Sequence, residues 1–285
     1  MKLAVFGSPI AHSRSPEIHQ AFAAQFGRTI EYQRILASPE QLSERFAEFV
    51  ASGGVGANVT VPLKEHALSF CAKLSPRAEQ AQAVNTLIHR NNEWLGHNTD
   101  GDGLVADLLR LGVKLRGARV LVLGAGGAVR GIIGPMLDAE VAHLHIANRT
   151  EVKAQKLLVE WQQRLAGELE ITPKVFYTLL TAGDLNSAAG SSGNGQWDII
   201  INATSTGLTQ ERPDIPDASL ANKPFCYDMV YGNQPTPFML WAENHGCAVA
   251  DGLGMLIEQA ALSYFQWAGD IPDTKVVLDS VRSQL

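Results

Sequence analysis

The stretch at positions 120–131, VLVLGAGGAVRG, constrains the fold more than any other part of the chain. Four apolar residues predict a buried strand, the glycines predict a tight turn, and the residues after them predict the start of a helix. A dinucleotide-binding βαβ unit needs this order. Gly124 would make the turn, and Gly126 and Gly127 would let backbone N–H groups approach a pyrophosphate.

The same motif departs from the GxGxxG pattern at its third glycine, which is replaced by Val129. The close helix-to-strand contact normally made there must then be managed by Ala128 or by a shifted helix. A glycine turn that binds nothing is the alternative interpretation. The position of the motif between a strand and a helix favours the cofactor site.

The end of the next expected strand, HLHIA at 143–147, predicts the cofactor type. This strand runs into Asn148, Arg149 and Thr150, where an NAD site would have an acidic residue for the ribose 2'-hydroxyl. A guanidinium suits the 2'-phosphate of NADP, and Lys153 could add a second cation. The alternative is a solvated Arg and Lys at a helix start, but the helix dipole disfavours positive charge there. The sequence therefore predicts NADP.

Strands and helices alternate along the chain, which predicts an α/β fold with two domains. Residues 1–100, completed by 252–285, would form the first domain, and residues 101–251 a Rossmann-like second domain, with the active site in the cleft between them. The expected strands are 2–6, 31–36, 58–61, 118–124, 143–147, 174–177, 197–202, 225–230 and 248–250, with a hairpin around Asn91 and Asn92. The segment 184–196, DLNSAAGSSGNGQ, is expected to be a mobile surface loop without chemistry.

Composition excludes several classes of partner. A formal net charge of −6 gives no reason to expect nucleic acid. The cysteines Cys71, Cys226 and Cys247 are far apart and form no CxxC pair, so neither a disulfide framework nor a zinc site is indicated, and a cytoplasmic protein is expected. No segment approaches the ~18 consecutive apolar residues of a membrane span. Eight histidines occur without an acidic cluster at ligand spacing, so no metal site is expected. The pair His143 and His145 would face one side of a sheet.

Four stretches of the first domain place polar residues beside strand ends: SPIAHSRSP, NVTVPLK, AVNT and HNTDGDG. Ligands of open α/β sheets bind outside such ends. The expected cavity is lined by Ser13, Ser15, Asn58, Thr60, Lys64, Asn85 and Asp100, which suits a small polyhydroxylated or carboxylated substrate. Structural alternatives stand beside this interpretation. Ser15 is expected to cap a helix that starts at Pro16, and Asn85 and Asp100 are also typical turn residues.

The segment NVTVPLKEH, at 58–66, is expected to be a strand that leads into a helix. Val59 and Val61 would anchor the strand in the core, while its polar residues Asn58 and Thr60 would face the cavity. Pro62 would end the strand and start the helix. Lys64 would then lie in the first helical turn, where a cation opposes the helix dipole, which favours a catalytic role.

The order of the motifs SxSP, NVTVPxK, VNT, NTDGxG, GAGGAxR, NRT, NATxxG, DMVY and GxxMLxxQA resembles the shikimate dehydrogenase family from Ser13 to Ala260. The resemblance implies reversible, NADP-dependent reduction of 3-dehydroshikimate to shikimate, on the route to chorismate and the aromatic amino acids. It also implies a monomer or homodimer whose first domain binds shikimate.

The same resemblance implies a role for individual residues. Ser13 and Ser15 would hold the substrate carboxylate. The ring hydroxyls would be held by Thr60, Lys64, Asn85, Asp100 and Gln259. Tyr231 and Gly252 would close the site near the cofactor. The cofactor residues would be Gly124, Ala125, Gly126, Gly127 and Ala128 for the pyrophosphate, Asn148, Arg149, Thr150 and Lys153 for the adenosine phosphate, and Thr204, Met229 and Gly252 for the nicotinamide half.

Removal of hydride from a secondary alcohol needs a base for the hydroxyl proton. The sequence has no Tyr-x-x-x-Lys set and no zinc ligand set, which leaves Lys64 and Asp100 as candidates. We expect Lys64 to exchange the proton and Asp100 to hold the geometry, although the sequence leaves open which of the two is the base. The rival functions are a quinate or quinate/shikimate dehydrogenase and, from another class, a non-catalytic sensor of NADP or a shikimate-like ligand.

Overall fold

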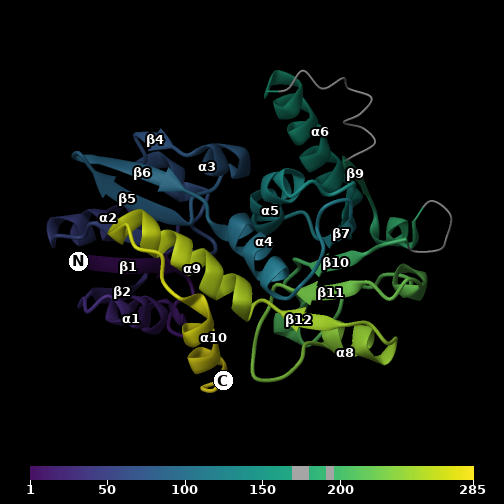
Figure 1. Cartoon of the computed structure of the whole chain (residues 1–285). Helices are drawn as coiled ribbons and strands as arrows, with labels where there is room; N and C mark the ends of the chain where they lie inside the picture. The colour runs from purple at the N-terminus through teal and green to yellow at the C-terminus, as the bar shows by residue number, and fades with distance from the viewer. Residues whose placement is uncertain (169–179, 191–195) are drawn as a thin grey trace. The chain divides into compact units, whose positions relative to one another are not determined.

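The computed structural model describes residues 1–168, 180–190 and 196–285 (Figure 1). The strand expected at 174–177 lies outside these residues. The chain forms two compact units: Met1–Ala106 together with Gly254–Leu285, and Asp107–Leu253. Each unit contains a six-stranded sheet, so the predicted α/β fold is confirmed. No helix in the described part of the chain combines the length and apolar character needed to cross a membrane.

The first unit is built on a mixed sheet with the strand order β2-β1-β3-β5-β6-β4. Its elements are β1 (Lys2–Gly7), α1 (Ser15–Gln25), β2 (Glu31–Leu36), α2 (Leu42–Ala51), β3 (Gly56–Val59), the 3-10 helix η1 (His66–Phe70), β4 (Lys73–Leu74), α3 (Pro76–Ala81), β5 (Thr86–Arg90), β6 (Glu93–His97), α4 (Asp100–Arg110), α9 (Leu253–Ala268) and α10 (Thr274–Arg282). The predicted hairpin is confirmed: β5 and β6 pair antiparallel, and Asn91 and Asn92 turn with φ values of 54° and 61°.

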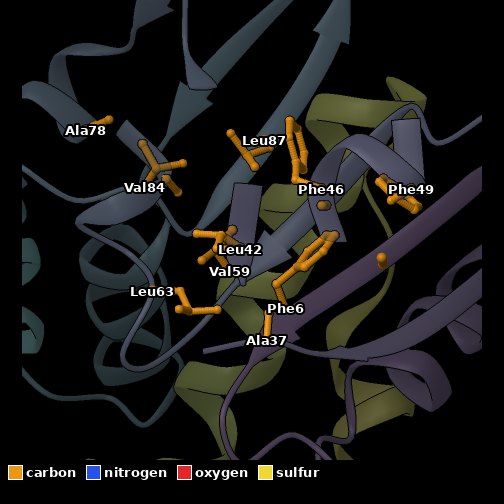
Figure 2. Close-up of a cluster of buried hydrophobic side chains, with 13 residues drawn as sticks. Phe6, Ala37, Leu42, Phe46, Phe49, Val59, Leu63, Ala78, Val84 and Leu87 are labelled. Carbon is orange, nitrogen blue, oxygen red and sulfur yellow. The ribbon is translucent and has the colours of Figure 1, made fainter. Parts of the chain in front are cut away.

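Aliphatic side chains and three phenylalanines form a buried cluster in the core of this unit (Figure 2). Phe6 of β1 makes edge contacts with two rings of α2, Phe46 at 5.9 Å and Phe49 at 5.7 Å between centroids. Val59 and Leu63 are buried in the same cluster. The chain is therefore held in the core on both sides of Thr60.

The second unit has an all-parallel sheet with the order β12-β11-β10-β7-β8-β9. Its elements are β7 (Arg119–Leu123), α5 (Gly127–Asp138), β8 (His143–Ala147), α6 (Glu151–Glu168), β9 (Leu180–Gly183), η2 (Leu185–Ala189), β10 (Ile199–Asn202), η3 (Thr206–Thr209), η4 (Asp217–Leu220), β11 (Phe225–Asp228), α8 (Pro237–Asn244) and β12 (Val249–Asp251). This is the strand order of a Rossmann fold. Strands β8 and β9 are added on one side of β7, and β10, β11 and β12 are added on its other side. A ligand is expected at that reversal.

Part of the expected mobile loop is ordered structure, so that prediction is wrong for 184–190. Asp184 caps η2 by accepting a hydrogen bond from Ser187 N, and Ala188 is buried. Trp197 Nε1 donates to the Ala188 carbonyl at 2.7 Å. The small residues that look like a linker in the sequence pack here against a tryptophan. Residues 191–195 lie outside the described chain.

The prediction that Ser15 caps a helix is also wrong. The helix α1 begins at Ser15 itself, and the capping position is occupied by Arg14 without a side-chain cap bond. Ser15 is buried, and its hydroxyl accepts a hydrogen bond from Ser13 Oγ at 3.1 Å. The hydroxyl is therefore engaged with another side chain and not with the helix backbone.

The segment after β3 differs from the prediction in three ways. The strand ends at Val59, Val61 is 68% exposed, and no helix begins at Pro62. Lys64 lies in a turn before η1, so the argument from an opposed helix dipole is wrong. Asn58 is buried, and its side chain bonds to Tyr32, His19 and Ser263. A single turn between two core residues, Val59 and Leu63, replaces the expected helix start.

Candidate active site

An ion pair between Lys64 and Asp100 forms the centre of the candidate site in the first unit. Lys64 Nζ lies 2.6 Å from Asp100 Oδ2, and the two side chains are 22% and 10% exposed. The turn that carries Lys64 is fixed because Val84 N donates to the Lys64 carbonyl at 2.8 Å. Asp100 opens α4, and its N–H donates to Asn98 Oδ1. The pair thus joins an acid and a base on two rigid supports, with access to solvent.

Asn85 and Gln259 complete this cluster. Asn85 Nδ2 donates to Asp100 Oδ1 at 2.9 Å and to Gln259 Oε1 at 3.2 Å. Four of the predicted substrate residues, Lys64, Asn85, Asp100 and Gln259, are therefore brought together. They present an ammonium, a carboxylate and two amides, which suits hydrogen bonding to several hydroxyl groups of one small ligand.

Gly103 explains how Gln259 reaches the cluster. A Cβ at Gly103 would lie 2.6 Å from Gln259 Cβ and 2.7 Å from its backbone nitrogen. Only glycine allows α4 and α9 to approach this closely. The helix α9 therefore contributes to a site made mainly by the first hundred residues.

Ser13 and Ser15 form a separate pair that lies next to the buried polar interior. Ser15 N and Ser15 Oγ both bond to Ser13 Oγ, and the Ser15 side chain contacts the Tyr32 hydroxyl. Thr60 follows β3, where its N–H donates to the Phe6 carbonyl at 2.9 Å. Two hydroxyls at a helix start can bind a carboxylate.

Three buried polar residues around Asn85 were not predicted from the sequence. Thr86, Thr99 and Ser263 each hydrogen-bond within the Asn85 surroundings and are essentially inaccessible to solvent. The motifs VNT and NTD contain two of them, directly beside the predicted Asn85 and Asp100. Ser263 had no such signal, because it lies in an otherwise apolar helix.

The glycine-rich turn of the second unit has the geometry of a phosphate site. Gly124 has φ of +115°, which favours glycine, and Gly126 caps the N-terminus of α5 with open space around it. Val129, in place of the third glycine, is fully buried within α5. The N-terminus of α5 therefore presents unblocked N–H groups, with a partial positive charge, beside the end of β7.

The residues after β8 lie where a Rossmann fold would bind the phosphate on the adenosine ribose. Arg149, Thr150 and Lys153 are exposed, and Asn148 Nδ2 donates to the Thr150 carbonyl at 2.8 Å. Within 1–168, 180–190 and 196–285, neither cation is paired with a carboxylate. Both are thus available to an anionic ligand.

A buried carboxylate braces the loops after β10 and β11. Asp228 accepts hydrogen bonds from Asn202 Nδ2, Thr236 Oγ1 and Val230 N, and burial raises the pKa of its carboxyl group above the usual value. Asn202 Oδ1 in turn accepts from the N–H and the hydroxyl of Thr204. The ends of β7 and β10 are neighbours, so this bracing lies at the reversal of the sheet.

The backbones of Met229 and Gly252 lie close together in the second unit. Met229 N donates to the Asn202 carbonyl at 2.9 Å, and Gly252 N donates to the Val230 carbonyl. A Cβ at Gly252 would lie 2.2 Å from the Met229 carbonyl oxygen, so no larger residue fits without a shift. Tyr231 follows on the same loop and is half-buried. Three of the predicted cofactor residues, Thr204, Met229 and Gly252, are thus held by one network.

The histidines supply no metal centre in the described part of the chain, where no group of three metal-ligating side chains occurs. His143 and His145 do face one side of the sheet, since both contact Thr181 Oγ1, at 2.7 and 2.8 Å. Burial lowers the pKa of each to about 4. They are neutral structural residues at physiological pH.

Comparison with protein families identifies three matching segments. Residues 5–87 match the shikimate dehydrogenase substrate binding domain, residues 107–176 match shikimate / quinate 5-dehydrogenase, and residues 252–282 match the shikimate 5'-dehydrogenase C-terminal domain. The matches follow the two units in chain order.

Individual relatives agree over the full length. The chain is 48% identical to shikimate dehydrogenase (NADP(+)) of Alcanivorax borkumensis over 280 residues, covering 98% of this chain and 95% of the relative. It is similar to the crystal structure of an Ael1 enzyme from Pseudomonas putida, with a TM-score of 0.87, 36% identity and coverage of 98% and 97%. It is also similar to shikimate 5-dehydrogenase from Thermus thermophilus in complex with NADP(H) and shikimate, with a TM-score of 0.84, 32% identity and 100% coverage of both chains.

Proposed function

The chain belongs to the shikimate dehydrogenase family, and we infer from this membership that it catalyses the reversible, NADP-dependent interconversion of shikimate and 3-dehydroshikimate. The single observation that best supports this chemistry is the partly accessible Lys64–Asp100 pair with Asn85 and Gln259 beside it. The product feeds the route to chorismate and the aromatic amino acids.

We assign substrate binding to the first unit. Ser13 and Ser15 bind the carboxylate, and the ring hydroxyls are bound by Thr60, Lys64, Asn85, Asp100 and Gln259. The polar character of this set supports the assignment, because a polyhydroxylated ring offers a partner to each amide and charge. Tyr231 and Gly252, which belong to the second unit, are assigned to the same function.

We assign NADP binding to the second unit. The pyrophosphate binds at Gly124, Ala125, Gly126, Gly127 and Ala128, the adenosine phosphate at Asn148, Arg149, Thr150 and Lys153, and the nicotinamide half at Thr204, Met229 and Gly252. The unblocked N-terminus of α5 and the two exposed cations support a fit to NADP. When bound, NADP exchanges a hydride with the substrate carbon.

Lys64 and Asp100 handle the proton of the reacting hydroxyl. In the direction of oxidation either the neutral amine of Lys64 or the carboxylate of Asp100 would accept the hydroxyl proton, while the carbon loses its hydride to bound NADP. In reduction the Lys64 ammonium or the protonated Asp100 would return the proton to the carbonyl oxygen. Because Lys64 Nζ and Asp100 Oδ2 lie 2.6 Å apart, a proton can pass between the two groups. Lys64 is proposed as the exchanging group and Asp100 as the group that holds its position and charge.

Two further features belong to the same proposal. We expect a cytoplasmic protein, which the three separate free cysteines support. We also expect a monomer or homodimer without nucleic-acid or membrane partners. Sedimentation equilibrium of the purified chain distinguishes the two assembly states.

The decisive experiment follows the absorbance of NADPH. Shikimate or quinate is combined with NADP or NAD in all four pairs, and fast turnover is expected with shikimate and NADP. Preference for quinate or NAD would indicate a quinate-type dehydrogenase. Absence of turnover in every pair would reject an enzyme and favour a sensor.

A further inference from the structure

The amide of Asn85 is oriented by bonds on its far side from the ion pair. Its Oδ1 accepts from Thr99 N at 2.9 Å and from Thr86 Oγ1 at 2.8 Å. Its Nδ2 therefore faces Asp100 Oδ1 at 2.9 Å and Gln259 Oε1 at 3.2 Å, and it also lies 2.8 Å from Thr99 Oγ1. Since an amide that rotates by 180° would exchange donor and acceptor, these bonds decide which of the two faces the ligand.

Thr86 has no solvent-accessible surface at the start of β5, and its hydroxyl contacts Asn85, Ser263 and Asn58. Its hydroxyl has one hydrogen, which it donates to Asn85 Oδ1. The Ser263 hydroxyl lies 2.7 Å from Thr86 Oγ1 and, since two oxygens this close need a hydrogen between them, donates to it in preference to the Gln259 carbonyl at 3.0 Å. Ser263 Oγ in turn accepts from Asn58 Nδ2 at 3.1 Å. The bonds thus run in one direction, from Asn58 through Ser263 and Thr86 to Asn85.

The start of this chain is itself fixed. Asn58 Oδ1 accepts from Tyr32 OH at 2.7 Å and from His19 Nε2 at 3.1 Å, so Nδ2 has to point toward Ser263. His19 stacks on Tyr32 with 4.8 Å between ring centroids. Burial lowers the pKa of His19 to about 3, which keeps the ring neutral. Elements α1, β2, β3, β5 and α9 all contribute to this one buried network.

We infer that Thr86 is a positioning residue for substrate binding, whose hydroxyl holds the Asn85 side chain so that its N–H groups face the substrate. The inference rests on the proposed role of Asn85 as a ligand of the ring hydroxyls. Thr86 acts entirely through Asn85, and Ser263 and Asn58 act through Thr86. The amide thereby presents its two hydrogens on this side, and a substrate hydroxyl oxygen binds there by replacing one of the three acceptors around it, of which Gln259 Oε1 is the most distant at 3.2 Å.

The experiment compares Thr86→Val, which keeps the shape and removes the hydroxyl, with Thr86→Ser, which restores the hydroxyl. Loss of one neutral hydrogen bond predicts a rise of about 5-fold in KM for shikimate in Thr86→Val, with KM for NADP unchanged. Thr86→Ser should return KM for shikimate to within about 2-fold of the original chain. KM does not depend on the active fraction, so partial misfolding leaves this readout intact.

Two further variants sharpen the result. Thr181→Val removes a half-buried threonine hydroxyl in the second unit and should lower the melting temperature without changing KM for shikimate. If Thr86→Val does not fold, Ser263→Ala replaces it, with a rise of about 2-fold in KM expected from a weakened middle link. An unchanged KM for shikimate in the folded variant, or a rise that serine does not reverse, overturns the inference. Turnover of shikimate by the original chain tests the proposed function separately.

Discussion

Lys64 Nζ donates to Asp100 Oδ2 at 2.6 Å across 36 positions of sequence. The other oxygen of Asp100 accepts from Asn85, so the carboxylate is held between a cation and an amide. This arrangement fixes the ammonium group and still leaves it in contact with solvent. Four predictions follow from this pair and from the other networks.

Replacing Lys64 by alanine should lower kcat for shikimate by ~100-fold or more, because general acid–base catalysis is lost. KM for NADP should remain nearly unchanged, since Lys64 belongs to the first unit. Steady-state rates with both ligands varied provide the measurement. Lys73→Ala is the matched control, because Lys73 lies in the same unit and pairs with an exposed Glu93. Wild-type turnover in Lys64→Ala would remove this lysine from the mechanism.

Replacing Arg149 by aspartate should raise KM for NADP ~10-fold or more and that for NAD much less, because only NADP has the phosphate that the guanidinium binds. Both constants are measured with saturating shikimate. Arg116→Asp makes the same charge change at another exposed arginine, which pairs with Glu140, and should alter neither constant. Equal effects on NADP and NAD would contradict the assignment of the 2'-phosphate site.

Replacing Asp228 by asparagine should destabilise the second unit. The new NH2 group would face other donors, from Thr236, Asn202 and Val230, and an unsatisfied buried group costs ~1–3 kcal/mol. The melting temperature should fall by roughly 2–10 °C, and KM for NADP should rise because the Thr204 loop loses its support. Asp214→Asn, at an exposed carboxylate, is the control. An unaltered melting temperature would show that the network does not need the carboxylate.

His19 should make the protein sensitive to acid. Its pKa is about 3 in the folded chain, against an ordinary value of 6.5, and burial is the cause. Below pH 6.5 the unfolded chain therefore binds a proton that the folded chain does not, so stability falls as the pH decreases toward 3. The groups around the ring are uncharged: Asn58, Phe22, Tyr32, Tyr264 and Trp267.

The measurement is the urea midpoint between about pH 7 and pH 4 for the original chain and for His19→Gln, whose amide can still donate to Asn58. The variant should lose less stability across this range, although it starts lower at neutral pH. Identical slopes for the two proteins would show that other groups control acid unfolding.

The sequence predicted the large elements because their periodicity is strong. The strand before Gly124 and the hairpin at Asn91 and Asn92 have patterns that can be recognised without knowledge of the residues packed against them. Some short elements were not predicted. The two residues of β4 and the six of α3 contain too few positions to show a period, and their place is set by pairing with β6 and by the cap at Ser75.

The candidate site was predicted from residues that occur together in short motifs. Some predictions that were drawn only from neighbours in the sequence, such as the helix cap at Ser15, were wrong. Ser15 looked like a helix cap because Pro16 follows it, but tertiary contact with Ser13 determines its hydroxyl. Asn58 was expected to face the ligand cavity because polar and apolar residues alternate at 58–61. Alternation separates the two faces of a strand, but it does not predict what each face contacts. The side chains of Tyr32 and His19, far away in the sequence, hold it inside.

The first unit is discontinuous, and α9 supplies both Gln259 and Ser263 to its polar interior. A ribosome delivers these residues after the whole second unit has been synthesised. The nascent chain therefore contains every strand of the first sheet before it contains the α9 partners of Asn85 and Asn58. The polar interior of the first unit therefore needs residues from both sides of the second unit in the sequence.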